Sequence, residues 1–257
     1  MAINGETIWI TGASSGIGKA LVEALAPNNQ LIITARNEVA LKGLQEKWPS
    51  IRILPADLSQ KSSTAQMKSQ LESFSDNLDR VILNAGNCEY SDPANPNWSS
   101  YENLLSVNLL GQVHCIEASI ELLKKAHAPH LVGVSSLAVR VPFPRAGAYG
   151  ASKAAASYMF DSLRMDLDQF GIDVTTIYPG FVDTPLTQKN QFDMPFLLTS
   201  EEAAKRMVTA MEKRPFNFSF PKRLDYLLRT LNLFPKWWLR KNGDKSASLD
   251  QQFASNR

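Results

Sequence analysis

The sequence predicts an α/β fold in three layers, a doubly wound sheet of about seven parallel strands with helices on both faces. Short β-branched and aromatic runs alternate with longer helical stretches along most of the chain. Such alternation predicts a parallel sheet, because neighbouring parallel strands are joined by long, right-handed crossovers. A glycine-rich turn directly after the first strand run supports this fold class. The sequence has no internal repeat and no linker, so we expect a single domain over residues 1–257.

Each expected element has its own signal in the sequence. The strands are short apolar runs, the helices are longer stretches between turn residues, and the loops are rich in proline, asparagine and serine. We expect strands at residues 7–10, 31–34, 51–54, 78–83, 131–136, 174–178 and 216–220. We expect helices at residues 19–26, 38–47, 60–74, 101–125, 148–170 and 200–213.

Composition and charge argue against several classes of protein. The formal net charge of +2 is too close to balance to suggest a nucleic-acid partner. The two cysteines, Cys88 and Cys115, fit a reducing compartment, so we expect a cytoplasmic protein. The histidines His114, His127 and His130 form no ligand cluster with them, and we expect no metal site. The sequence has no signal-peptide pattern and no apolar run of 18 or more residues, so we expect no membrane span.

The glycine-rich turn over residues 11–18 has the features of a phosphate-binding loop. It reads TGASSGIG and lies between the first strand run and the first helix. Glycines let the backbone turn tightly and let a pyrophosphate come close, while the helix start offers free N–H groups. The turn therefore predicts dinucleotide binding, with an unliganded tight turn as the alternative. The expected contacts are Gly12, Ser14, Ser15, Gly16, Ile17 and Gly18.

The end of the second strand indicates which dinucleotide is bound. Ala35 and Arg36 occupy this position, and the first acidic residue is Glu38. In dinucleotide-binding folds an acid here binds the ribose 2′-hydroxyl, whereas an arginine accommodates a 2′-phosphate. The sequence therefore favours NADP(H) over NAD(H), with an ordinary solvated arginine as the alternative.

A tyrosine and a lysine in the expected helix 148–170 are candidate acid–base groups. Tyr149 precedes Lys153 by four residues, so the two side chains share a helix face. A free phenol has a pKa of ~10, and a nearby ammonium lowers this value. A tyrosine adjusted in this way can exchange a proton with an alcohol or a carbonyl. The same spacing also occurs on ordinary helix surfaces, so other motifs must support the assignment.

Taken together, the motifs of residues 7–184 resemble the short-chain dehydrogenase/reductase family. Residues 11–18 match its Thr-Gly-x3-Gly-x-Gly turn, and Tyr149 with Lys153 matches its Tyr-x3-Lys pair. Ser136 lies thirteen residues before Tyr149, the usual interval in that family. The resemblance implies a Rossmann fold and hydride transfer between NAD(P) and a carbonyl or secondary alcohol. It also implies cofactor contacts by Asp57, Leu58, Asn84, Ala85, Gly86, Tyr149, Lys153, Pro179, Gly180, Val182 and Thr184.

The resemblance further implies four catalytic residues. Ser136 would hydrogen-bond the reacting oxygen, and Tyr149 would exchange the proton with it. Lys153 would lower the pKa of Tyr149 and hold the nicotinamide ribose, while Asn108 would anchor a water that relays protons to Lys153. The alternative function is a catalytically silent dinucleotide-binding sensor or scaffold, which the complete set of candidate catalytic residues argues against.

The substrate is expected to be a small, apolar carbonyl compound or alcohol. The expected pocket walls are residues 137–143 and 181–196, with a substrate loop at about 185–199. Arg140 and Arg145 could hold an acidic group, although solvated loop arginines are the favoured interpretation. The expected apolar wall consists of Phe143, Phe181, Phe192, Met194 and Phe196.

A C-terminal extension, about residues 221–257, lies outside the resemblance. Its leucines have helical spacing, Pro235 interrupts the pattern, cationic residues lie on both sides of this proline, and tryptophans follow it. We expect residues 224–239 to pack against the substrate-loop region and help wall the active site, with a loose polar end beyond them. Peripheral membrane contact is the open alternative. The long helices 101–125 and 148–170 are those that family members pair, so we expect a homo-oligomer, a dimer or tetramer.

Overall fold

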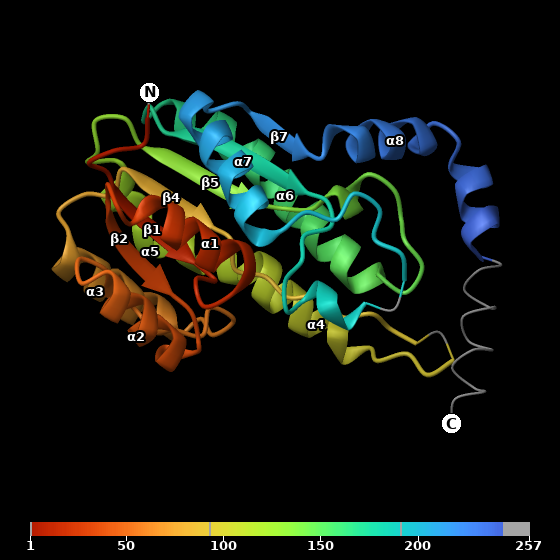
Figure 1. The fold of residues 1–257 in the computed structure, drawn as a ribbon, viewed down its shortest axis with the longest axis horizontal. Helices are drawn as coiled ribbons and strands as arrows, with labels where there is room; N and C mark the ends of the chain where they lie inside the picture. Colours follow the sequence, from red (N-terminus) through yellow and green to blue (C-terminus); the bar gives the residue numbers. More distant parts are fainter. Residues whose placement is uncertain (1, 93, 191, 244–257) are drawn as a thin grey trace.

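A computed structural model describes residues 2–92, 94–190 and 192–243, which form a doubly wound α/β fold (Figure 1). The sheet has seven strands in the order β3-β2-β1-β4-β5-β6-β7, and each neighbouring pair is parallel. The expected fold class is therefore confirmed. The strand order reverses between β1 and β4, which opens a crevice at the carboxyl edge of the sheet. The strands are β1 (Thr7–Thr11), β2 (Gln30–Thr34), β3 (Arg52–Ile53), β4 (Arg80–Leu83), β5 (His130–Val134), β6 (Asp173–Pro179) and β7 (Asn217–Phe220).

Helices cover both faces of the sheet. On β1, Ile8 and Ile10 pack into one apolar core and Trp9 into the other, because successive side chains of a strand point to opposite faces. The first core is closed by α1 (Gly16–Leu25), α2 (Glu38–Lys47) and α7 (Ser200–Lys213). The second core is closed by α3 (Ser63–Phe74), α5 (Gly111–Leu123) and α6 (Gly147–Asp168).

The expected helix 101–125 is built from three parts. It begins as α4 (Ser99–Leu105), continues as a π-helical segment (Ser106–Leu110) and ends as α5. Residues 106–110 therefore complete a wider turn than an α-helix would. Asn108 lies in this turn and is fully buried. The sequence predicts the helix but not its π segment.

The extension after β7 forms two helical segments. The first, α8 (Lys222–Asn232), starts at the carboxyl end of β7, and the second covers residues 235–243. The break at Pro235 was expected. The proline is the first residue of the second helix, a position whose N–H would have no partner within the helix, so its missing N–H costs nothing there. The expected loose end after residue 239 is wrong for residues 240–243, which are helical. The rest of that end, residues 244–257, lies outside the described residues.

The inner side of the extension packs on the loop that follows β5. Leu224 and Leu228 are buried against Leu137, Val141 and Tyr178. The buried leucines therefore pack on one expected pocket wall, residues 137–143, whereas the contact expected from the sequence was with the substrate-loop region at about 185–199. Among the described residues, no helix combines the length and apolar character needed to cross a membrane.

Candidate active site

A cleft of about 330 Å³ opens at the carboxyl edge of the sheet, beside the crevice between β1 and β4. Its walls include every site residue expected from the sequence except Asn108, which is buried behind it. The structure therefore brings the expected cofactor residues and the expected proton-transfer residues to one place. The expected residues that line the cleft are Gly12, Ser14, Ser15, Gly16, Ile17, Gly18, Arg36, Asp57, Leu58, Asn84, Ala85, Gly86, Ser136, Tyr149, Lys153, Pro179, Gly180, Val182 and Thr184.

The glycine-rich turn forms a cradle that larger residues would fill. Gly12 and Gly16 have φ angles of +69° and +52°, in the left-handed region that glycine tolerates best. A Cβ on Gly18 would lie 2.1 Å from the Gly12 carbonyl oxygen. A Cβ on Gly16 would lie 2.8 Å from Thr184 Cγ2, on the loop across the cleft. Only glycine lets the turn fold this tightly, and all three glycines line the cleft, where a ligand can approach the backbone.

The first turn of α1 adds an anion-binding end to this cradle. Ser15 is the N-cap in an extended conformation, and its side chain makes no capping hydrogen bond among the described residues. The described first turn also contains no acidic residue. Its N–H groups and the helix dipole can therefore serve a bound phosphate. The cradle and this helix start fit the pyrophosphate of a dinucleotide.

The end of β4 is tied to this turn by hydrogen bonds. The Thr11 hydroxyl oxygen accepts the N–H groups of Asn84 and Ala85, each at 3.1 Å. Asn84 Nδ2 donates to the Thr11 carbonyl oxygen at 3.1 Å. A Cβ on Gly12 would lie 2.7 Å from Ala85 Cα, so the two segments are in direct contact. These contacts fix the floor of the cleft.

Helix α6 carries the two expected acid–base residues at the other wall. Lys153 is buried and its Nζ donates to the Val134 carbonyl oxygen at 3.0 Å. Burial lowers the pKa of Lys153 to about 8, since the charged form loses hydration. Burial raises the pKa of the Tyr149 phenol above its ordinary value, and a hydrogen bond with Ser136 offsets this only in part. The expected lowering of the Tyr149 pKa is therefore wrong for this structure, because burial and the neighbouring Cys88 raise the pKa more than the Ser136 hydrogen bond lowers it.

Asn108 is held rigidly beside Lys153. Its Nδ2 donates to the Asn87 carbonyl oxygen and to Ser152 Oγ, both at 2.9 Å, and its Oδ1 accepts from the Asn87 N–H at 2.7 Å. A Cβ on Gly86 would lie 3.1 Å from Lys153 Nζ and 3.2 Å from Asn108 Oδ1. The amide and the ammonium therefore border the same small space.

Two of these partners were not expected from the sequence. Ser152 Oγ donates to the Tyr149 carbonyl oxygen at 2.8 Å and so links Asn108 to the first turn of α6. Asn87 supplies both a backbone donor and a backbone acceptor to Asn108. The position of Ser152, three residues after Tyr149 on the same helix, is a signal that could have identified it.

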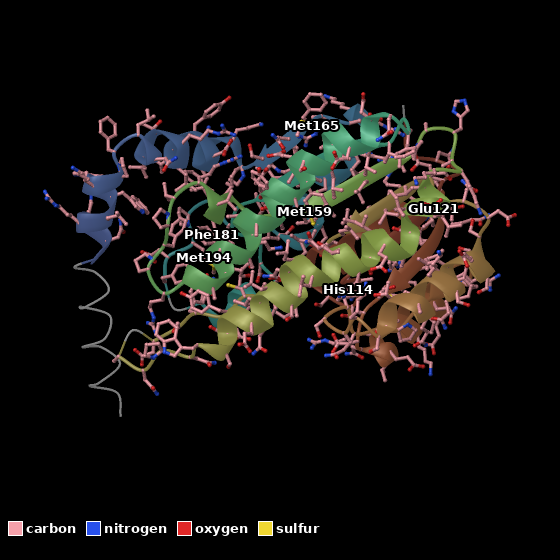
Figure 2. The ribbon with its side chains drawn as sticks, turned by 180° about the vertical axis from the view of Figure 1, so that it is seen from behind. His114, Glu121, Met159, Met165, Phe181 and Met194 are labelled. Atoms are coloured by element: carbon pink, nitrogen blue, oxygen red, sulfur yellow. The ribbon has the colours of Figure 1, made fainter. Side chains whose placement is uncertain are left out.

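Aromatic side chains of the loops after β4 and β6 contact one another. The ring of Phe192 lies 5.5 Å from that of Tyr90 and 6.0 Å from that of Phe181, both edge to face. Phe181 and Met194 lie at the end of the molecule that also carries the C-terminal helices (Figure 2). Phe181 lies between Gly180 and Val182, which line the cleft, but the described cleft lining includes none of the five residues of the expected apolar wall. Burial raises the pKa of the neighbouring Cys88 thiol to about 11, so this thiol stays protonated near neutral pH.

Two loop arginines are held by the protein rather than solvated. Arg140 Nε donates to Asp225 Oδ1 at 2.9 Å, and its guanidinium lies 4.4 Å from the ring centroid of Tyr178. Arg145 Nε donates to the Ser91 carbonyl oxygen at 3.2 Å. The favoured interpretation of both as solvated side chains is therefore wrong.

Comparison with known proteins gives the family. The family model of the short chain dehydrogenases matches residues 6–195, about three quarters of the chain. The chain belongs to this family. It is an oxidoreductase of the short-chain dehydrogenase type, which acts between CH–OH and C=O groups with NAD(P).

Relatives and solved structures agree with this assignment. An uncharacterized oxidoreductase of Myxococcus xanthus is 32% identical over 90% of this chain and 93% of its own length. Mouse L-fucose dehydrogenase is 30% identical over 72% of this chain and 68% of its own.

Two crystal structures from the genus Burkholderia share the fold of this chain. A short-chain dehydrogenase of Burkholderia phymatum with NAD has a TM-score of 0.79 at 21% identity, covering 89% of this chain and 93% of that one. One of Burkholderia cenocepacia with NADP has a TM-score of 0.81 at 22% identity, covering 94% and 98%. Because one neighbour holds NAD and the other NADP, the shared fold does not select the cofactor.

Proposed function

We propose that this protein is an NADP(H)-dependent oxidoreductase that uses Tyr149 as proton donor to a small, apolar carbonyl substrate. The observation that carries the proposal is the meeting of Tyr149, Ser136 and Lys153 in the same cleft as the glycine-rich cradle. The cradle supplies a place for the dinucleotide, and the three side chains supply the proton chemistry. The reverse oxidation of an alcohol would use the same groups.

Tyr149 and Ser136 act on the reacting oxygen in this proposal. When bound, the nicotinamide supplies the hydride that a carbonyl carbon receives. Burial keeps the Tyr149 phenol protonated near neutral pH, which suits it to donate a proton as charge grows on the carbonyl oxygen. The Ser136 hydroxyl shares a hydrogen bond with Tyr149 and can donate to the same oxygen.

Lys153 and Asn108 support the proton donor. Lys153 Nζ is directed by its bond to the Val134 carbonyl, and its remaining N–H groups are able to hold a ribose hydroxyl. The pKa of Lys153, about 8, lets the ammonium persist at neutral pH while making its proton easier to release. Asn108 Oδ1 borders the space beside this ammonium, which suits it to hold a water that returns protons.

The preference for NADP(H) rests on the residues at the tip of β2. Arg36 is exposed and lines the cleft, so its guanidinium is available to a 2′-phosphate. Glu38, the nearest acid along the chain, is not among the described residues that line the cleft. It is therefore a poor candidate for a ribose 2′-hydroxyl.

The test is a turnover screen with NADPH. Aromatic and aliphatic ketones and aldehydes are offered as substrates, and loss of absorbance at the nicotinamide band is followed. Turnover of an apolar carbonyl supports the proposal. Tight NADPH binding with no turnover of any carbonyl or alcohol would favour the silent sensor instead.

A homo-oligomer remains a prediction. Helices α5 and α6 lie side by side on one face of the molecule (Figure 2). The two helices expose Val113, Tyr158 and Met165, and a pair built on these helices could cover these side chains. The cytoplasmic location expected from the sequence also remains a prediction.

A further inference from the structure

The C-terminal extension has an outer surface that no other described part of the chain covers. Its two helical segments lie at the end of the molecule away from α2 and α3 (Figure 1). Large apolar side chains are exposed along them, with Leu233 at 74%, Phe234 at 61% and Trp237 at 51%. A soluble domain rarely exposes so many large side chains together. We call these residues the tail surface: Tyr226, Leu227, Leu233, Phe234, Trp237 and Leu239.

The tail surface lies opposite the face that packs on the protein. Leu224 and Leu228 are buried, and they follow one another at the spacing of one helix turn. Tyr226 falls about half a turn away from them, Leu227 falls at the edge of the buried face, and both are exposed. Leu233 follows Tyr226 by seven residues and continues the same exposed stripe. The extension thus has two apolar faces, and among the described residues only one of them packs on the rest of the protein.

Contacts with the loop after β5 fix the orientation of the tail surface. Asp225 is buried in α8 and accepts hydrogen bonds from Arg140 at 2.9 Å and from Ser219 at 2.7 Å. Trp238 Nε1 donates to the Pro142 carbonyl oxygen at 2.7 Å. The extension is therefore held against the wall of the cleft, and its exposed residues form a fixed platform.

The charge of the extension indicates which kind of partner can cover the tail surface. The chain as a whole has a net charge of +2, yet residues 222–243 carry several cations and Asp225 as their sole acid. That acid is paired with Arg140 and Arg229 and offers no free negative charge. Because cations are in excess around it, the tail surface favours an anionic partner. The cationic residues of this segment are Lys222, Arg223, Arg229, Lys236, Arg240 and Lys241.

We propose that the tail surface docks on an anionic lipid bilayer. Exposed aromatic and leucine side chains among lysines and arginines are the features of helices that lie in a membrane interface. Tryptophan is suited to the headgroup level, where its ring is partly apolar and its N–H finds partners. Each cation near such a surface adds to the attraction. The membrane contact named as the open alternative for this segment is thus compatible with its packing on the protein.

This docking would bring the substrate side of the cleft to the lipid. Helix α8 begins at the carboxyl end of β7, the same edge of the sheet at which the cleft opens. Leu224 Cδ2 would lie 3.0 Å from a Cβ on Gly180, a residue of the cleft wall. An enzyme docked in this way could take an apolar substrate that partitions into the membrane. The docking itself is independent of the proposed reaction.

The test is flotation of the purified full-length protein with vesicles. One set contains equal parts of phosphatidylcholine and phosphatidylglycerol, and the other contains phosphatidylcholine alone. The parent is expected to float with the anionic vesicles, more strongly at low salt than at high salt. Charge reversal by Lys236→Glu, Arg240→Glu and Lys241→Glu should weaken this binding by about a hundredfold or more. Removing apolar contact by Leu233→Ser, Phe234→Ser and Trp237→Ser should weaken it by at least about tenfold.

Variants elsewhere on the surface separate docking from general charge effects. Lys205→Glu with Arg206→Glu and Lys213→Glu reverses three exposed cations of α7, as many as the tail variant does, and Val39→Ser alters one exposed apolar residue of α2. Both controls should bind like the parent. The proposal is overturned if the parent does not float with anionic vesicles, or if the controls lose binding as much as the tail variants. It is also overturned if the serine variant alone converts a lipid-free dimer to a monomer, because a second copy would then cover the surface.

Discussion

Replacing Asp225 with asparagine should loosen the C-terminal extension from the cleft wall. The carboxylate is buried and accepts three hydrogen bonds, from Arg140 Nε at 2.9 Å, Ser219 Oγ at 2.7 Å and Arg229 Nε at 3.0 Å. In Asp225→Asn, one oxygen becomes an NH₂ group that can no longer accept, and the negative charge is lost. At least one donor then loses its partner, and Arg140 keeps a partly buried charge with no counter-ion.

The cost can be estimated from these contacts. A hydrogen bond to a charged group contributes about 1.5–3 kcal/mol, and removing one partner of a buried ion pair costs up to about 5 kcal/mol. Because the amide keeps one acceptor and Arg229 is half exposed, we expect the free energy of unfolding to fall by about 2–4 kcal/mol. For a chain of this size the Tm should fall by roughly 5–15 °C. Urea denaturation and a thermal scan followed by circular dichroism measure both quantities.

The difference in stability between the parent and Asp225→Asn should depend on pH in a definite direction. Burial alone would raise the pKa of Asp225, but hydrogen bonds from Ser219, Arg140 and Arg229 hold it below the ordinary value of 3.8. The stability gained from the carboxylate is therefore present above that value and is lost as the pH falls through the lower, folded-state pKa. The difference in the free energy of unfolding between parent and variant should persist from pH 8 to pH 5 and should shrink in stronger acid. Asp161→Asn removes an exposed ion pair with Arg164 and should change stability by under about 0.5 kcal/mol. Equal effects of the two substitutions would refute the reasoning.

Three further predictions concern the cleft. Gly18→Ala places a Cβ 2.1 Å from the Gly12 oxygen, so the turn must shift and the Kd for NADPH, measured by fluorescence titration, should rise about tenfold or more; an unchanged Kd would contradict the cradle. Because the pKa of Lys153 is about 8, kcat/KM for NADPH should fall as the pH rises through that value and the ammonium is lost; a level profile between pH 7 and pH 10 would count against this role. Arg36→Ala should reduce the preference for NADPH over NADH by about tenfold or more in kcat/KM; identical ratios in parent and variant would exclude Arg36 as the 2′-phosphate partner.

Local patterns explain why the fold could be predicted from the sequence. Alternation of apolar strand runs with helical stretches is a short-range signal, and it gave all seven strands and the parallel sheet. The third strand was expected over residues 51–54 but pairs over two residues only, because strand length at a sheet edge depends on a neighbour that the sequence does not specify. The π segment around Asn108 was not predictable for a similar reason. Residues 106–110 are of types that also occur in α-helices, so they give no local signal for a π-helix. The buried hydrogen bonds of Asn108 with Asn87 and Ser152, which accompany the wider turn, join residues far apart in the chain.

The candidate site was predictable in position but not in its electrostatics. The spacing of Tyr149 and Lys153 predicted their common location, which depends on helix geometry alone. It did not predict that burial would raise the pKa of Tyr149, because burial is set by residues far away in the chain. The pairing of Arg140 with Asp225 joins residues 85 positions apart and leaves no local signal. Long-range contacts of this kind need the structure.

Turnover by Tyr149→Phe tests the central claim most directly. The substitution removes the phenolic hydroxyl that would donate the proton and leaves the cradle unaltered. The Kd for NADPH should stay close to that of the parent, while kcat with a carbonyl substrate found in the screen should fall by about a hundredfold to ten-thousandfold. Turnover close to the parent's, with NADPH still bound, would contradict the assignment of Tyr149 as the proton donor.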